Sequence, residues 1–347
     1  MPMHELVSIS TDNATAHTPV LELSECVLNQ LGPEASRMAR AAGLPGIAIC
    51  VSITDDFTTD VESHQSRESV AYTTQRAGGV VGAMTLDPHQ TGDGWRILVN
   101  STAFGGQDSW ARVPLPYTLG HEVAHCLIGE RRRLDGGPQG YSSCPESLLD
   151  TIGYTALNVC DEWLADEMGR LLVPPSQVVI HLEDGDTTAT DRQVLAAQRL
   201  DGMSDALDHH VYPALAATVR RWDGTDEGLQ AMTLGLVTGI QEALVLSAHY
   251  RSAVRDLAPD LDAVCRVTQH RGTRLYLAPF WARVGPVLES RLANGPLMDF
   301  ASEDQRAFDE AAEGVTGFWR ALGVRFELLD DSRVYVHVDE PLDDTSR

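Results

Sequence analysis

The first half of the chain changes from a helical to a strand-like spacing of apolar residues. Residues 21–42 carry apolar side chains at helical spacing and end at the helix-breaking sequence Gly-Leu-Pro, so we expect a helix there. Between residues 46 and 100, short β-rich runs separated by turn signals predict a small, largely antiparallel sheet. These runs are Ile47–Ile53, Val70–Gln75, Val80–Leu86 and Trp95–Asn100.

Two long helices are expected next, over residues 117–133 and 145–172, with a loop rich in Gly, Pro and Ser between them. Pro174 and Pro175 end the second helix, because proline cannot continue a helical backbone. Residues 1–20 are polar and show no periodicity, so we expect a loose N-terminal tail.

The second half of the chain has mainly helical periodicity. An acidic, turn-rich segment within residues 175–190 precedes it. We therefore expect an α+β protein in which a compact domain at residues 21–178 is followed by a mainly helical domain at residues 179–347. Helices are expected over residues 191–222, 226–257, 275–292 and 303–322, and a terminal β-hairpin over 324–329 and 333–338.

The charge balance excludes several classes of partner. The 347 residues include 50 acidic and 26 basic side chains, which gives a formal net charge of −24. A surface this negative repels phosphate backbones and anionic lipid head groups, so we expect neither direct nucleic-acid binding nor membrane binding. All the basic residues are arginine, which we attribute to codon bias rather than to function.

No targeting segment is evident in the sequence. The apolar stretch at residues 229–250 is interrupted by Gln230, Gln241 and Glu242, so it falls short of the roughly 20 clean residues that a bilayer span needs. The N-terminus lacks the basic and apolar regions of a secretory signal. We therefore expect a cytoplasmic protein whose six cysteines are reduced.

The sequence His121-Glu122-Val123-Ala124-His125 is an H-E-x-x-H motif within the helix expected at residues 117–133. Histidines four residues apart lie on one helix face, where both imidazoles can bind one metal ion. Zn²⁺ is the expected ion, and three protein ligands would leave a fourth position for water, from which Glu122 would take a proton. Chance occurrence of the motif is the alternative, so the context has to decide.

The next helix supplies a candidate third ligand, Glu162. Its carboxylate and that of Asp166 are four residues apart on one helix face, so one can bind the metal while the other accepts the free ring N–H of a ligand histidine. An ordinary solvated acidic face is the alternative interpretation. The three arginines at residues 131–133 are expected to complement the C-terminus of the first of these helices.

Taken together, these motifs resemble the zinc metallopeptidases of the ImmA/IrrE type. Residues 117–125 read Y-T-L-G-H-E-V-A-H, similar to the family's (F/Y)-T-x-A-H-E-x-x-H, and residues 97–100 resemble the I-x-v-N strand that precedes it. Allowing for spacing, residues 162–174 are similar to the family's E-x-x-A-(N/D)-x-F-A-x-x-L-L-x-P. The chain departs from these patterns in having Gly120 where alanine is common and Met168-Gly169 where Phe-Ala is usual.

The resemblance covers about residues 30–180 and implies a gluzincin-like α+β domain. It implies that His121, His125 and Glu162 bind zinc, with Glu122 as general base and Asp166 as the partner of a ligand histidine. It also implies that residues 80–85 form an edge strand with which an extended peptide can pair.

By the same resemblance, the expected activity is endoproteolysis of a protein substrate, such as a transcriptional repressor or another regulatory protein. Two alternatives from other classes stay open: a zinc-binding interaction module without proteolytic activity, and a zinc hydrolase of a small amide. A structural zinc site has no need of a general base, so Glu122 disfavours the interaction module.

Overall fold

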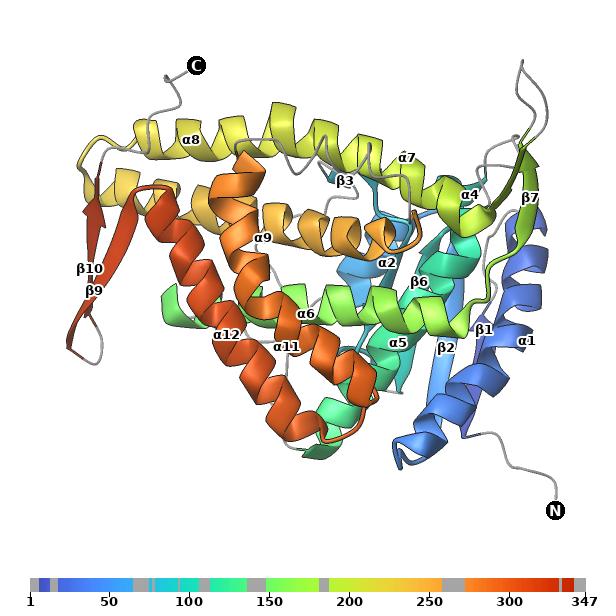
Figure 1. Ribbon diagram of the computed structural model, residues 1–347. Helices are drawn as coiled ribbons and strands as arrows, with labels where there is room; N and C mark the ends of the chain where they lie inside the picture. The colour runs from blue at the N-terminus through green and yellow to red at the C-terminus, as the bar shows by residue number, and fades with distance from the viewer. Residues whose placement is uncertain are drawn as a thin grey trace. The chain divides into compact units, whose positions relative to one another are not determined.

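Figure 1 shows the fold of the protein as a computed structural model. The protein is a mixed α+β protein, mainly helical, with a small sheet and a C-terminal β-hairpin, so the coarse fold class is as expected. The structure describes residues 6–12, 18–64, 75–76, 79–92, 94–105, 113–135, 148–180, 187–257, 272–330 and 333–339.

The chain forms two compact units, each built from segments that are separate in sequence. The first unit comprises Met1–Ser143, Asp161–Ala196 and Arg291–Ser302. The second comprises Cys144–Cys160, Ala197–Ser290 and Glu303–Arg347. The boundaries after residues 160, 196, 290 and 302 lie within helices, whereas a single boundary after residue 178 was expected from the sequence. That residues 21–178 fold as an autonomous domain stays a prediction.

A four-stranded sheet with the strand order β1-β2-β6-β5 forms the centre of the first unit. Strands β1 and β2 are parallel, as are β2 and β6, whereas β5 pairs antiparallel with β6. The expectation of a largely antiparallel sheet is therefore wrong. The strands are β1 (Val7–Asp12), β2 (Ile47–Thr54), β5 (Ala83–Leu86) and β6 (Trp95–Asn100).

The error arises from β1, which lies in the segment expected to be a loose tail. Its sequence V-S-I-S-T-D is half serine and threonine, so it lacks the apolar run by which the other strands are recognised. Helix α1 (Thr18–Ala41) follows it and serves as the long crossover that parallel pairing with β2 requires. The backbone N–H of Val7 also donates a hydrogen bond to Ser36 Oγ of α1 at 2.9 Å. Residues 7–12 are thus part of the sheet.

Two of the expected strand runs differ from the structure. Residues 70–74 lie outside the described part of the chain, and Gln75 and Arg76 form β3, which pairs antiparallel with β4 (Gly79–Val80). The run expected at residues 80–86 is thus divided between β4 and β5. The division matters for the site because β5 alone belongs to the main sheet.

Helices lie on both faces of this sheet. On one face, α1 and α5 contact each other as well as the strands, and they are the blue and teal helices of Figure 1. On the other face, Leu98 of β6 and Leu86 of β5 pack with Phe57 and Val61 of α2. The remaining helices of this part of the chain are α2 (Phe57–His64), α3 (Pro88–Thr91), α4 (Ser101–Phe104) and α5 (Pro114–Asp135).

The segment after α5 carries the second site helix and a hairpin. Helix α6 (Leu148–Leu172) begins in the second unit and ends in the first. Strands β7 (Gln177–Ile180) and β8 (Thr187–Thr190) then pair antiparallel and lead into α7 (Asp191–Ala206). Thr190 and Gln193 form a capping box, in which each side chain accepts the other's backbone N–H, and this fixes where α7 begins.

The second unit is helical, with a terminal hairpin as expected. The helix predicted over residues 191–222 is continuous but contains a π-helical turn, and a second π-helical turn opens the helix predicted at residues 275–292. The elements after α7 are η2 (Leu207–Val211), α8 (Tyr212–Arg220), α9 (Asp226–Val254), η3 (Thr273–Leu277), α11 (Ala278–Asn294), α12 (Phe300–Ala321), β9 (Val324–Asp330) and β10 (Arg333–Val338).

Helix α9 contains the apolar stretch noted in the sequence. It is long and apolar enough to cross a membrane, a property that it shares with buried core helices of soluble proteins. One face of α9 is buried, and there Ser247 Oγ accepts a hydrogen bond from the indole N–H of Trp281 at 2.8 Å. This buried polar contact gives α9 a defined partner within its own unit.

Candidate metal centre

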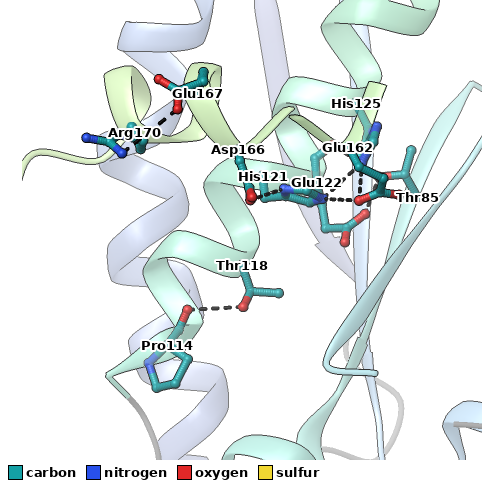
Figure 2. Close-up of polar contacts among 10 residues, drawn as sticks. All are labelled: Thr85, Pro114, Thr118, His121, Glu122, His125, Glu162, Asp166, Glu167 and Arg170. Atoms are coloured by element: carbon teal, nitrogen blue, oxygen red, sulfur yellow. Dashed lines mark hydrogen bonds and ion pairs between the residues drawn. The ribbon is translucent and has the colours of Figure 1, made fainter. Parts of the chain in front are cut away.

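Helix α5 brings the two motif histidines together. It begins at Pro114, a residue suited to the first helical position because the missing N–H has no partner there in any case. His121 and His125 follow one turn apart, each with 14% of its side chain exposed, and their Nε2 atoms lie 2.9 Å from each other. Both rings therefore present a nitrogen to one point (Figure 2).

Helix α6 adds Glu162 to the same point. Its Oε2 atom lies 3.2 Å from Nε2 of His121 and 3.7 Å from Nε2 of His125. Tetrahedral zinc with bonds of about 2.1 Å places its ligand atoms about 3.4 Å apart, which lies between these two separations. Among the described residues, His121, His125 and Glu162 form a group whose possible ligand atoms all lie within 4.8 Å of one another. The donor set therefore fits zinc.

Asp166 holds one of the candidate ligands in place. Its Oδ1 atom lies 2.9 Å from Nδ1 of His121, with 7% of the Asp166 side chain exposed. This contact leaves Nε2 of His121 directed at the metal position and sets its tautomer when the ring is neutral. The structure thus places Asp166 where the sequence analysis put the partner of a ligand histidine.

The metal-free cluster has perturbed proton affinities. Burial by itself lowers the pKa of His121, but the hydrogen bonds and negative charges of Asp166 and Glu162 outweigh it and hold this pKa well above 6.5. Burial raises the pKa of Glu162, but the positive charges and hydrogen bonds of His125 and His121 outweigh it and hold this pKa well below its usual value. The two groups therefore form an ion pair in the absence of metal.

Glu122 has a partner that the sequence did not reveal. The hydroxyl of Thr85 donates to Glu122 Oε2 at 2.6 Å and lies 3.1 Å from the backbone oxygen of the same residue. Thr85 belongs to β5, the edge strand of the sheet, so the contact joins strand and helix beside the three candidate ligands (Figure 2). Only the tertiary pairing brings residues 37 positions apart into contact, and no local signal predicts it.

Cys126, the neighbour of His125, is fully buried, and its thiol lies close enough to Thr85 and Glu122 for both residues to affect its pKa. Burial first, and then the charge of Glu122, raise the pKa of its thiol well above the ordinary value. The side chain therefore stays a neutral thiol at physiological pH and packs as a small apolar group.

Contacts around the candidate metal centre connect α5 with the segments that follow α6. The hydroxyl of Tyr117 donates to Asp191 Oδ1 at 2.6 Å, and the guanidinium of Arg192 lies 5.6 Å above the Tyr117 ring. Arg192 also donates to the backbone oxygens of Arg170 and Val173, so it caps the C-terminus of α6. Tyr117 of the motif thus has an anchoring role.

A second connection, between α5 and α6, lies further along α5. Arg132 and Asp161 form a two-pronged ion pair with both contacts at 2.6 Å, and both side chains are almost fully buried. Arg132 was expected to interact with the end of its own helix, and its burial against Asp161 corrects that expectation. Because Asp161 directly precedes Glu162, the pair fixes the position of this part of α6 relative to α5.

Asn100, the last residue of the I-x-v-N strand, has a structural role next to the centre. Its side-chain amide donates to the backbone oxygen of Val81 at 3.1 Å, and its backbone N–H donates to the oxygen of Gly82 at 2.8 Å. These bonds hold the start of β5, and hence Thr85, at the sheet edge.

Comparisons with known proteins found no relative of this chain. No family model matches the chain, and neither the curated proteins nor the solved structures contain a match to it.

Proposed function

We propose that the protein is a zinc-dependent endopeptidase that hydrolyses a peptide bond in a protein substrate. The observation that carries the proposal is the convergence of His121, His125 and Glu162 on one point, with the carboxylate of Glu122 beside it. A structural zinc site needs four ligands and no base, whereas three ligands and an adjacent carboxylate are typical of hydrolytic zinc.

Each residue then has a defined task. A zinc ion, when bound, would supply a Lewis acid that polarises both water and the scissile carbonyl. Glu122 takes the proton from the attacking water and returns it to the leaving amine. Thr85 orients that carboxylate, and Asp166 keeps the ring of His121 turned toward the metal position.

The edge position of β5 supports a peptide as the substrate. A strand at the edge of a sheet has unpaired backbone N–H and C=O groups, with which an extended peptide can pair. Thr85 of that strand touches Glu122, so a peptide added to β5 would run past the base. This favours a protein substrate over a small amide. We further propose, on the family resemblance, that it is a transcriptional repressor or another regulatory protein.

The negative charge of the protein shapes the remaining expectations. At a net charge of −24, direct contact with nucleic acid or an anionic membrane is disfavoured, so recognition of DNA would belong to the substrate. We place the activity in the cytoplasm for the reasons given from the sequence.

The first test is zinc content in purified wild-type protein and in the folded variants His121→Ala and Glu162→Gln. We expect about one zinc per wild-type chain and its loss from both variants, with Glu25→Gln, an exposed position on α1, as the matched control. No zinc in the wild type after reconstitution would contradict the metal site.

The second test separates proteolysis from mere zinc binding. The variant Glu122→Gln keeps zinc and the shape of the site but lacks the base, so it should retain an uncleaved protein that the wild type releases as two fragments. Sequencing of the fragments gives the cleavage site. If both proteins bind the same partner and neither cleaves it, the interaction module is the better interpretation.

A further inference from the structure

Two glycines mark the closest approach of α5 and α6. A Cβ atom built on Gly169 would lie 3.0 Å from the backbone N of His121 and 3.2 Å from its Cα. A Cβ atom built on Gly120 would lie 2.7 Å from Cγ2 of Val173 and 3.3 Å from the backbone oxygen of Gly169. The helices therefore touch backbone to backbone beside the first candidate ligand.

Helix interiors disfavour glycine, because it loses more conformational freedom than other residues when the helix forms. Helix propensity therefore does not explain why glycine occupies these two facing positions, whereas the lack of space for a Cβ atom does.

Gly169 lies on the same face of α6 as the candidate ligand. Glu162, Asp166 and Gly169 are spaced by four and then three residues, which is the spacing of one helix face. All three contact α5 at or near His121. The distance between the helices at Gly169 therefore controls how far the Glu162 carboxylate reaches toward the histidines.

We propose that Gly169 is a positioning residue of the metal centre, whose missing side chain lets α6 approach α5 closely enough for Glu162 and His121 to share one zinc ion. The inference rests on the proposed function only in taking the centre to bind zinc. An alanine at residue 169 meets backbone atoms rather than a movable side chain, so the helices must separate by a few tenths of an ångström. Zinc ligand distances tolerate only about 0.2 Å.

Gly120 provides a contrast within the same contact. An alanine there meets mainly the Val173 methyl group, which a second substitution can remove. Gly120→Ala should therefore weaken zinc binding, and Gly120→Ala with Val173→Ala should restore much of it. Val173→Ala should not restore binding to Gly169→Ala, because backbone atoms of residues 120 and 121 cause that clash.

The test measures zinc affinity by competition with a chromophoric chelator, at a temperature where circular dichroism shows every variant folded. We expect Gly169→Ala to bind zinc at least ten-fold more weakly than wild type, and its cobalt-substituted form to show an altered visible spectrum. Gly202→Ala on α7, where a Cβ atom meets nothing within 4 Å, should bind zinc as wild type does. Alanine also favours the helix, so a general loss of helix stability cannot account for the result.

A double substitution shows whether Gly169 acts through Glu162. Glu162→Gln should lose its zinc during purification, but chelator competition at raised zinc concentration can still measure its residual affinity; in that background Gly169→Ala should weaken zinc binding by much less than ten-fold, since the ligand it positions is already lost. Unchanged zinc affinity and cobalt spectrum in Gly169→Ala would overturn the inference, as would a full ten-fold effect in both backgrounds. Failure of the wild type to bind zinc would overturn the metal site as well, whereas failure of proteolysis alone would leave the inference intact.

Discussion

The Thr85 hydroxyl donates a hydrogen bond to Glu122 Oε2 at 2.6 Å, and this contact joins the edge strand of the sheet to the carboxylate proposed as general base. Glu122 is 7% exposed, so few water molecules can replace Thr85 as a donor. A substrate peptide paired with β5 would lie on the strand that also orients the base. If the protein is the proposed peptidase, substrate binding and proton transfer would be linked through Thr85.

Replacing Thr85 should slow cleavage without removing zinc. In Thr85→Val the carboxylate of Glu122 loses its donor, and we expect turnover to fall on the order of ten-fold, within the 10²–10⁴ that a general base contributes as a whole. Thr85→Ser keeps the hydroxyl and should restore most of the rate. Cleavage of the substrate identified with Glu122→Gln, followed together with zinc content, checks this. Equal rates for the valine and serine variants would contradict the orienting role.

Removing the partner of His121 should weaken metal binding. Asp166→Asn takes away the carboxylate that holds Nδ1 of this ring, and loss of such a partner typically lowers metal affinity by about 10- to 100-fold. Zinc affinity from chelator competition is the measurement, with Asp201→Asn at an exposed position of α7 as control. Wild-type affinity in Asp166→Asn would show that the ring is held by other contacts.

Zinc binding should release a proton near neutral pH. The pKa of His121 lies well above 6.5 in the metal-free protein, so the ring is protonated there and must lose its proton to bind zinc. Calorimetry in two buffers of different ionisation enthalpy should give about one proton released per zinc, and apparent affinity should rise with pH. Asp166→Asn should release fewer protons, because it removes the largest interaction that raises this pKa. Equal release from both proteins would contradict the assignment to His121.

The same shift predicts how the stability of the metal-free protein depends on pH. Since the folded-state pKa of His121 is raised, its contribution is fully present below about pH 6.5 and is lost as pH rises through the folded-state value. The pKa of Glu162 is lowered, so its contribution is lost as pH falls toward that lower value. Urea unfolding of chelator-treated protein should thus show less stability at alkaline pH, and His121→Ala should remove that part of the decline.

The sequence predicted those features that depend on local signals. Helix ends were predicted where proline or glycine interrupts the apolar periodicity, and His121 and His125 were predicted to share a helix face from their spacing alone. The structure also brings Glu162 and Asp166 to that face, while zinc binding by this group stays a prediction.

Features that depend on tertiary contacts were not predicted. Strand β1 is too polar to be recognised from its sequence. It pairs with β2 because α1 crosses over between the two strands, and such a crossover makes the pairing parallel. Thr85 becomes part of the site only because β5 lies at the sheet edge against α5. From the sequence alone, Gly169 only lowers the helix propensity of α6. Its close contact with the backbone of α5 becomes evident only in the structure.

Breaking the buried ion pair Arg132–Asp161 should destabilise the fold strongly, although the intact pair should add little stability compared with apolar residues. Asp161→Asn removes the negative charge that faces the buried Arg132 guanidinium in this pair, and we expect a loss of about 3–5 kcal/mol in the free energy of unfolding. Replacing both residues, as Arg132→Met with Asp161→Leu, should recover most of this stability, because a buried ion pair gains little over apolar residues of similar volume. Urea denaturation of the zinc-free proteins measures both effects. A double variant as unstable as Asp161→Asn would show that the pair is itself needed to hold α6 against α5.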